Sequence, residues 1–210
     1  GQIGDVIMFS ATVRRIKQIF PNSSITFAVS ERYRQAGELL AGLPYIDKLF
    51  ITELYFEKLA PERVPLFEAG WPLELRGDDE IEEQKHYDLV FNTRPRCRRR
   101  PWWRYGHLVE ELAHRAGVPG PIDIRTEIVI PPGTTAPCDA HNKIILHNDA
   151  SIDPRKGWSW EYVREVVRSL PDGSVILVGT HGEVVPGVLD MRGLTTLAQT
   201  AALIAQCKCY

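Results

Sequence analysis

An aspartate near the start of the chain is the first residue whose type and position could support chemistry. Asp5 follows the glycines Gly1 and Gly4, and an apolar stretch typical of a helix comes after it. Glycines three apart suit a tight turn from a strand into a helix, where backbone N–H groups can face an anion or a sugar hydroxyl. A carboxylate at such a turn can accept a proton from an attacking hydroxyl. The alternative is an ordinary turn in which the helix dipole alone favours Asp5.

A second candidate is a polar loop between a strand expected over 144–147 and a helix expected from residue 159. Ser151 in this loop offers a hydroxyl group, while Arg155 and Lys156 offer positive charge. Together with the partial positive charge of the helix N-terminus, these groups could hold a diphosphate. An exposed basic loop is the alternative.

A third candidate lies after the next strand, which is expected over 174–179. Glu183 follows this strand closely. An acidic residue in that place can accept hydrogen bonds from ribose hydroxyls. The alternative is an ordinary loop without a binding role. Further along, Thr195 or Thr196 is expected to cap the last helix, over 196–206.

A cluster of basic and aromatic side chains is the fourth candidate. It contains Arg94, Arg96, Arg98, Arg99, Arg100 and Arg104, with Trp102 and Trp103 among them. Arginines beside aromatic residues are typical of nucleic-acid binding. They suit a phosphorylated or carboxylated partner equally well. A solvated loop is the third possibility for the cluster.

Composition excludes several classes of protein. The chain has 210 residues, 44% of them hydrophobic, so a sizeable core is expected and disorder is not. A net charge of −2 gives no general attraction to nucleic acid or to membranes. No stretch approaches the roughly 20 apolar residues that a membrane span needs. The four cysteines, with one Cys-x-Cys pair, fit neither a disulfide framework nor a zinc site, which favours free thiols in a reducing cytoplasm.

Apolar strands alternate with amphipathic helices along the chain. Helices are expected over 10–20 (with Ser10 as the N-cap), 31–41, 106–116, 159–170 and 196–206. Strands are expected over 25–29, 49–51, 87–91, 144–147 and 174–179. This alternation predicts βαβ units, hence an α/β protein with parallel sheets.

A segment rich in proline and small polar residues divides these elements into two sets. It predicts an N-terminal domain over 1–131, a linker over 132–142 and a C-terminal domain over 143–210. Ligands of such folds bind near the carboxyl ends of the strands, so the chemistry is expected in a cleft between two α/β halves. Both ends of the chain appear cut, and we expect a fragment whose second domain is incomplete.

The order of these segments resembles the ADP-heptose:lipopolysaccharide heptosyltransferases, glycosyltransferase family 9. The similar stretches are GQIGDVIMFSATVRRIKQIFPNSSITFAV, LLAGLPYIDKLFI, HYDLVFNTR, IILHNDASIDPRKGWSWEYVREVV, VILVGTHGE and MRGLTTLAQTAALIAQCKCY. They cover most of the chain, and the similarity is weakest over 52–86 and 93–104. Order and spacing carry the resemblance, since no single motif is decisive.

The resemblance implies a GT-B fold of two Rossmann-like parallel-sheet domains. It also implies inverting transfer of a sugar from a nucleotide donor, commonly ADP-heptose, with no cofactor and no required metal. It places Asp5 on the general base, Lys156 on the lysine that meets the donor diphosphate, Ser151 beside it, Glu183 near the ribose, and Thr195 and Thr196 on the nucleotide pocket. Gly4, Arg94 and Arg96 are assigned to a loop that meets phosphate or the acceptor.

The implied partners are a nucleotide-sugar donor and an anionic oligosaccharide or lipid-linked glycan acceptor, such as the bacterial lipopolysaccharide core, and not nucleic acid. The implied location is the cytoplasm, with peripheral association at the inner face of the inner membrane. Ala11 stands where the family usually has proline. The family's first strand and its later aspartate-serine/threonine-glycine…histidine motif are absent. Residues 1–210 alone are therefore expected to be poorly stable and to lack activity.

Two other functions remain open at this point. One is a nucleotide-sugar-binding module that keeps the fold without catalysis, and the role of Asp5 distinguishes it from an enzyme. The other is an RNA-binding protein that uses residues 94–104, for which salt-sensitive RNA binding would be diagnostic.

Overall fold

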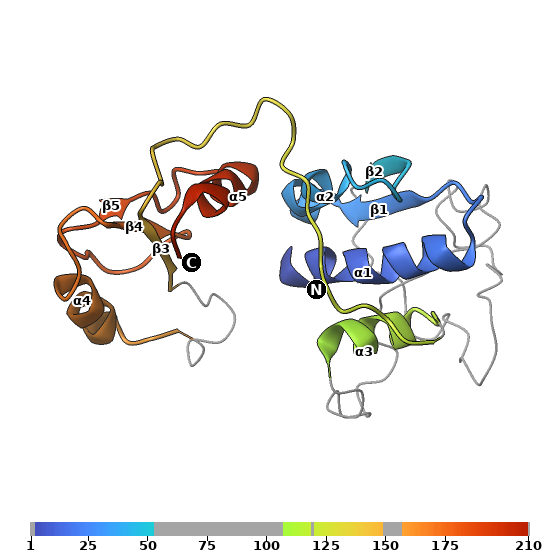
Figure 1. The fold of residues 1–210 in the computed structure, drawn as a ribbon, viewed down its shortest axis with the longest axis horizontal. Coiled ribbons are helices and arrows are strands. Elements are labelled where there is room, and N and C mark those ends of the chain that lie inside the picture. Colours follow the sequence, from blue (N-terminus) through green and yellow to red (C-terminus); the bar gives the residue numbers. More distant parts are fainter. Residues whose placement is uncertain (1–2, 53–106, 119, 149–156, 210) are drawn as a thin grey trace. The chain divides into compact units, whose positions relative to one another are not determined.

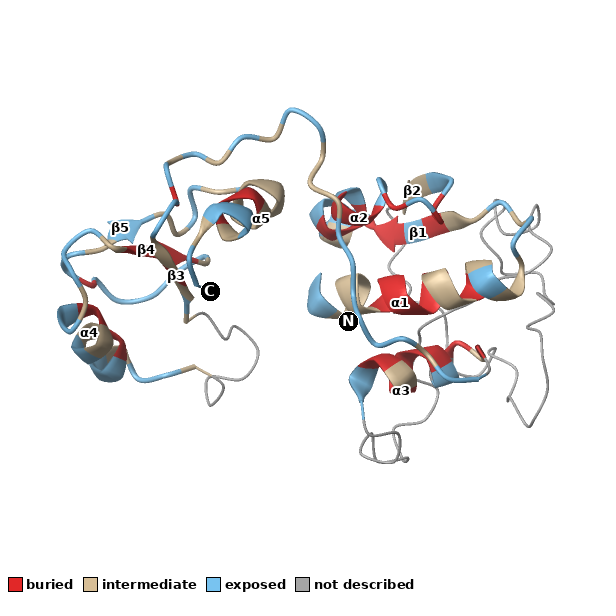
Figure 2. Ribbon diagram, in the orientation of Figure 1, coloured by how far each residue is buried: buried red, intermediate tan, exposed pale blue. Residues whose placement is uncertain are grey.

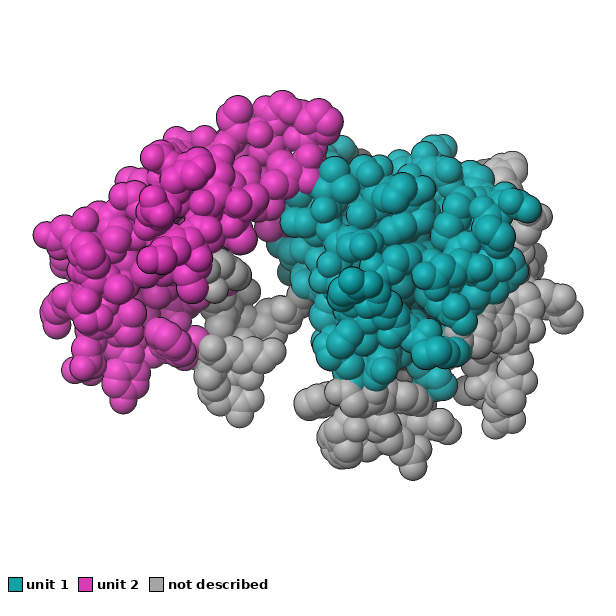
Figure 3. All heavy atoms as spheres, in the orientation of Figure 1, with its two compact units in different colours: residues 1–129 teal, residues 130–210 magenta. Residues whose placement is uncertain are grey.

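The computed structural model describes residues 3–52, 107–118, 120–148 and 157–209. The chain divides into two compact units, Gly1–Val129 and Ile130–Tyr210, which Figure 3 distinguishes by colour. The strand expected over 87–91 and the arginine-rich cluster lie outside the described residues. Each unit is described by itself below.

The first unit contains a short parallel sheet with helices packed against it (Figure 1). Its described elements are α1 (Ile3–Ile19), β1 (Thr26–Ser30), the 3₁₀ turn η1 (Glu31–Tyr33), α2 (Arg34–Leu40), β2 (Lys48–Thr52) and α3 (Leu108–Arg115). β1 and β2 pair in parallel, with Thr26 opposite Lys48 and Ser30 opposite Thr52. η1 and α2 form the crossover that a parallel connection requires.

The helix α1 begins earlier than the sequence predicts. Ser10 was expected at its N-cap, but it lies in the middle of the helix and is fully buried. Its Oγ accepts a hydrogen bond from the backbone N–H of Glu127 at 3.1 Å. The N-cap prediction for Ser10 is therefore wrong, because a serine can also satisfy a backbone donor that reaches it from a distant segment.

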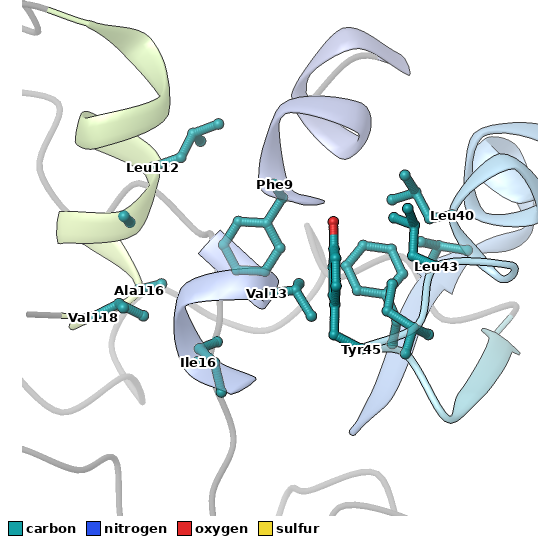
Figure 4. Close-up of a cluster of buried hydrophobic side chains, with 13 residues drawn as sticks. Phe9, Val13, Ile16, Leu40, Leu43, Tyr45, Leu112, Ala116 and Val118 are labelled. Atoms are coloured by element: carbon teal, nitrogen blue, oxygen red, sulfur yellow. The ribbon is translucent and has the colours of Figure 1, made fainter. Parts of the chain in front are cut away.

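Apolar side chains from several elements meet in one core in this unit (Figure 4). Phe9, Val13 and Ile16 lie on the same face of α1, at the spacing expected for a buried helical stripe. Phe9 packs against Phe27 of β1, with 6.2 Å between the ring centroids. Leu112 of α3 belongs to the same cluster. Removal of these apolar side chains from water holds the helices on the sheet.

An extended segment before the end of the first unit is tied to α1 by polar contacts. Arg14 donates from Nη2 to the carbonyl oxygens of Asp123 and Arg125, both at 2.9 Å. Its Nη1 lies 2.9 Å from the carboxylate of Glu127. Tyr45 donates to the other oxygen of that carboxylate at 2.8 Å, and burial together with this contact raises the pKa of the Tyr45 hydroxyl. The backbone carbonyls of residues 123 and 125 are not paired in a sheet, so the Arg14 side chain supplies their hydrogen-bond donor.

The second unit is built on a three-stranded parallel sheet. Its elements are β3 (Ile144–His147), α4 (Trp160–Arg168), β4 (Val175–Val178), β5 (Leu189–Asp190) and α5 (Leu197–Gln206). The strand order is β3-β4-β5, and both pairs are parallel. The short strand β5 is absent from the sequence prediction.

Helices cover both faces of the central strand β4, all of whose residues are buried (Figure 2). Ile176 and Val178 share a cluster with Leu203 of α5. Val175 and Leu177 point the other way and cluster with residues of α4. Because strand side chains alternate, an unbroken apolar run such as Val-Ile-Leu-Val is what a strand covered on both faces requires.

Part of the segment expected to be a linker packs on the second unit. Ala140 is fully buried in the cluster that contains Ile145 and Leu203, and Ala136 and Cys138 pack against the same cluster. These residues therefore belong to the core of the second unit. The structure as a whole is of the mixed α/β class with short parallel sheets, as the alternation of strands and helices predicts.

The fully buried leucine of α5 provides a test of this core. Leu203→Ala is expected to lower the free energy of unfolding by about 2–5 kcal/mol, because it removes apolar burial and leaves a cavity. The matched control is Leu194→Ala, since Leu194 is 68% exposed and Leu203 is 0% exposed. Chemical denaturation followed by circular dichroism measures both variants, and equal losses for the two would contradict the described packing.

Candidate functional site

Three segments of the second unit leave the sheet at the same edge. They are the chain after β3, which starts at Asn148, the loop after β4, residues 179–184, and the chain after β5, residues 191–196. Parallel strands place their carboxyl ends together, and ligands of parallel sheets bind at this edge. The N–H of Gly193 donates to the carbonyl of Gly179 at 2.9 Å, so the second and third segments are in direct contact.

Asn148 connects the end of β3 to the start of α4. Its Oδ1 accepts from the N–H of Trp158 at 2.7 Å, and its Nδ2 donates to the carbonyl of Trp158 at 2.9 Å. Ser159 follows as the N-cap of α4. The predicted diphosphate residues Ser151 and Lys156 fall between these two points and lie outside the described residues.

Glu183 lies on the loop after β4, as the sequence predicts, and two arginines contact it. Its carboxylate Oε2 pairs with Nη2 of Arg164, which belongs to α4. Its backbone carbonyl accepts from Nη2 of Arg192 at 2.9 Å. The side chain of Glu183 remains 58% exposed.

Arg192 is a residue of this site that sequence reasoning missed. Its side chain is only 9% exposed and pairs with Asp190, with Nε 2.9 Å from Oδ1 and Nη2 2.6 Å from Oδ2. The guanidinium also lies over the indole of Trp160, 5.3 Å from the ring centroid, in a cation–π contact. The Asp-x-Arg spacing was the available signal, because it allows a local ion pair, but spacing alone does not reveal burial.

The two predicted threonines lie at the start of α5 and differ in role. Thr196, one of the two threonines predicted as the cap, is the N-cap and forms a reciprocal capping box with Gln199. Thr196 Oγ1 accepts from the Gln199 N–H at 3.1 Å, and Gln199 Oε1 accepts from the Thr196 N–H at 2.9 Å. Thr195 instead shares a hydrogen bond with Thr200, with 2.9 Å between the hydroxyl oxygens. Both threonines therefore stabilise the helix start at this edge.

In the first unit, Gly4 and Asp5 lie in the first turn of α1. Gly4 is exposed and Asp5 is half-buried. A carboxylate in the first turn of a helix is stabilised by the helix dipole, so this position fits the alternative described for Asp5 as well as a catalytic one. The role of Asp5 as a base stays a prediction.

The predicted site residues Arg94 and Arg96 lie outside the described residues. Within the described ranges, no cluster of three or more histidine, cysteine, aspartate or glutamate residues is placed to hold a metal ion. The cysteines described, Cys138, Cys207 and Cys209, are free thiols. No helix in the part of the chain that the structure describes is both long and apolar enough to cross a membrane.

The capping box predicts a measurable cost of altering Thr196. Thr196→Ala is expected to lower the free energy of unfolding by about 1 kcal/mol, because it leaves an N–H of the first turn of α5 without its side-chain acceptor. Gln199→Ala removes the other half of the box. In a double-mutant cycle measured by denaturation, the combined loss should differ from the sum of the single losses. Strict additivity would contradict a reciprocal box.

The Asp190–Arg192 pair predicts a dependence of stability on pH. Hydrogen bonds from the Arg192 side chain hold the pKa of Asp190 below its ordinary value, against the opposing effect of burial. A carboxylate with a lowered pKa in the folded state stabilises it fully above the unfolded pKa, about 4, and this contribution is lost as the pH falls through the folded pKa.

Acidification from pH 7 to pH 3 should therefore lower the thermal midpoint more in the unmodified chain than in Asp190→Asn. Asp123, whose pKa Arg125 lowers to about 2, acts in the same direction in both proteins and cancels in the comparison. Equal shifts in the two proteins would show that the pair contributes no acid-sensitive stability.

Comparison with protein-family models, with curated protein sequences and with solved structures gives no match to this chain. The candidate site is therefore defined by the geometry described above. In the second unit, Glu183, Thr195 and Thr196 lie on connected segments at the carboxyl edge of one parallel sheet.

Proposed function

We propose that this chain belongs to a glycosyltransferase of the GT-B type. The reaction is inverting transfer of a heptose, or a related sugar, from a nucleotide sugar to a hydroxyl of an anionic glycan. ADP-heptose is the donor to test first, and the lipopolysaccharide core is the acceptor. Neither a cofactor nor a required metal forms part of the proposal. The cytoplasm, at the inner face of the inner membrane, is the proposed location.

One observation supports the donor side most directly. The segments that carry Glu183, Thr195 and Thr196 leave the same carboxyl edge of a parallel sheet, and the bond from Gly193 to Gly179 joins them. Nucleotides bind to α/β sheets at this edge, where helix N-termini can face phosphate groups and an acidic side chain can accept from ribose hydroxyls. The exposed carboxylate of Glu183 and the start of α5 supply these two features.

The proposed chemistry gives the base role to Asp5 and the stabilisation of the leaving group to Lys156. Asp5 accepts the proton of the acceptor hydroxyl as that oxygen attacks the anomeric carbon of the sugar. The bond from the anomeric carbon to the diphosphate oxygen breaks, and the nucleoside diphosphate leaves with the electron pair. Lys156 and the helix N-termini compensate the charge that develops on this leaving group. Attack opposite to the leaving group inverts the anomeric centre.

Calorimetric titration of the full-length protein with ADP, GDP and UDP tests the donor site. The proposal predicts selective binding of ADP, and Lys156→Ala should weaken this binding roughly tenfold or more, because it removes a charged partner of the diphosphate. Lys208→Ala is the control, since Lys208 is an exposed lysine of the same unit. Selective binding of UDP or GDP would change the donor, and no nucleotide binding would overturn the donor-site assignment.

Asp5→Asn separates catalysis from binding alone. With an acceptor present, the enzyme hypothesis predicts that this variant keeps ADP affinity and loses turnover. The exposed Asp172→Asn serves as the control for loss of a carboxylate. Binding without turnover in the unmodified full-length protein would favour the non-catalytic nucleotide-sugar-binding module.

A further inference from the structure

Arg192 and Arg125 each form an ion pair with the aspartate two residues before them. The two pairs have the same local geometry but differ in exposure to water. In Asp123-x-Arg125 and in Asp190-x-Arg192, the arginine N–H donates to the aspartate Oδ1 at 3.1 Å and the guanidinium reaches both carboxylate oxygens. The Arg125 side chain is 81% exposed, whereas that of Arg192 is 9% exposed. The spacing therefore produces the pair, and tertiary packing alone buries Arg192.

Burial of a guanidinium is unfavourable unless other groups compensate for lost hydration. At Arg192 the compensation comes from three directions. Asp190 neutralises the charge, Trp160 lies against the guanidinium, and the carbonyl of Glu183 accepts from Nη2. Nη1 has no hydrogen-bond partner among the described residues, so the contacts through Nε and Nη2 carry the attachment.

The backbone of the loop after β4 lies directly on this arginine. Gly182 has a φ of +143°, and a Cβ at this position would overlap both the Trp160 ring and Nη1 of Arg192. Only glycine fits so close an approach with that backbone conformation. The loop is thus held between Trp160 at the start of α4 and Arg192, the second residue after β5.

The side chain of Glu183 provides a second attachment of the same loop. Arg164 of α4 pairs with the Glu183 carboxylate and donates from Nε to the carbonyl of Val184 at 3.5 Å. Arg192 therefore holds the backbone at Glu183, while Arg164 holds the carboxylate. The two arginines come from different segments, and both bring Glu183 toward α4.

We propose that Arg192 is a positioning residue: it fixes the loop after β4 so that the Glu183 carboxylate is presented at the carboxyl edge of the sheet. That the carboxylate then receives ribose hydroxyls rests on the function proposed above. The fixing of the loop is independent of the proposed function, because it follows from contacts within the second unit.

Two measurements test the two parts separately in the full chain. Hydrogen exchange of the Gly193 amide, which donates to the carbonyl of Gly179 at the start of the loop, reports on the loop. The dissociation constant for ADP reports on the ligand. Arg192→Met keeps an apolar side chain beside Trp160 and removes the hydrogen bonds. Asp190→Asn keeps the arginine and removes its charge partner. Arg125→Met is the matched control, because it deletes the same local pair where it is exposed.

Arg192→Met is expected to speed exchange in the loop and to weaken ADP binding, each by roughly tenfold, the effect of losing a hydrogen bond made by a charged group. Asp190→Asn should show smaller changes of the same kind, and Arg125→Met should show neither. Arg192→Lys should recover part of both losses, since it keeps the charge without the planar fork.

The outcomes distinguish this inference from the proposed function. Unchanged loop exchange in folded Arg192→Met and Asp190→Asn would overturn the positioning role, and so would an equal change in Arg125→Met. A lower thermal midpoint with unchanged ADP affinity would reduce Arg192 to a structural residue and also overturn it. If the unmodified chain binds no nucleotide, the proposed function fails, while loop exchange still decides whether Arg192 holds the loop.

Discussion

The central strand of the second unit, β4, is the element on which the rest of that unit depends. Its four residues are apolar and buried on both faces, so a helix must cover each face. Parallel pairing with β3 and β5 then leaves no choice about where the connecting segments emerge, because the carboxyl ends of parallel strands share one edge. The grouping of Glu183 with the start of α5 is therefore a consequence of the parallel pairing of the strands around β4.

The edge itself is organised by polar contacts. Asn148 joins the end of β3 to the start of α4, and the bond from Gly193 to Gly179 joins the chain after β5 to the loop after β4. Arg192 adds a charge that is largely shielded from water and is compensated through Nε, Nη2 and the face of its guanidinium. Such contacts are directional, unlike apolar burial, so they can set the position of a loop that the core alone would leave free.

The first unit shows how much of a fold of this kind can be predicted and where prediction stops. The strand and helix patterns over 25–29 and 31–41 appear as β1, η1 and α2, because local alternation and periodicity reflect which face is buried. The start of α1 was misplaced, because Ser10 satisfies the N–H of Glu127, 117 residues away in the chain. The contacts of Arg14 with residues 123–127 were missed for the same reason, because Arg14 and its partners lie far apart in the sequence.

The sequence by itself determined the α/β class, the alternation of elements and a threonine cap at the start of α5, Thr195 or Thr196, since these depend on local patterns of residues along the chain. It also placed Glu183 after a buried strand. Only the tertiary structure decided that Arg192 is buried while Arg125, in the same Asp-x-Arg pattern, stays exposed. The physical reason is that burial depends on what packs against a side chain, and Trp160 and Gly182 reach Arg192 from other parts of the chain.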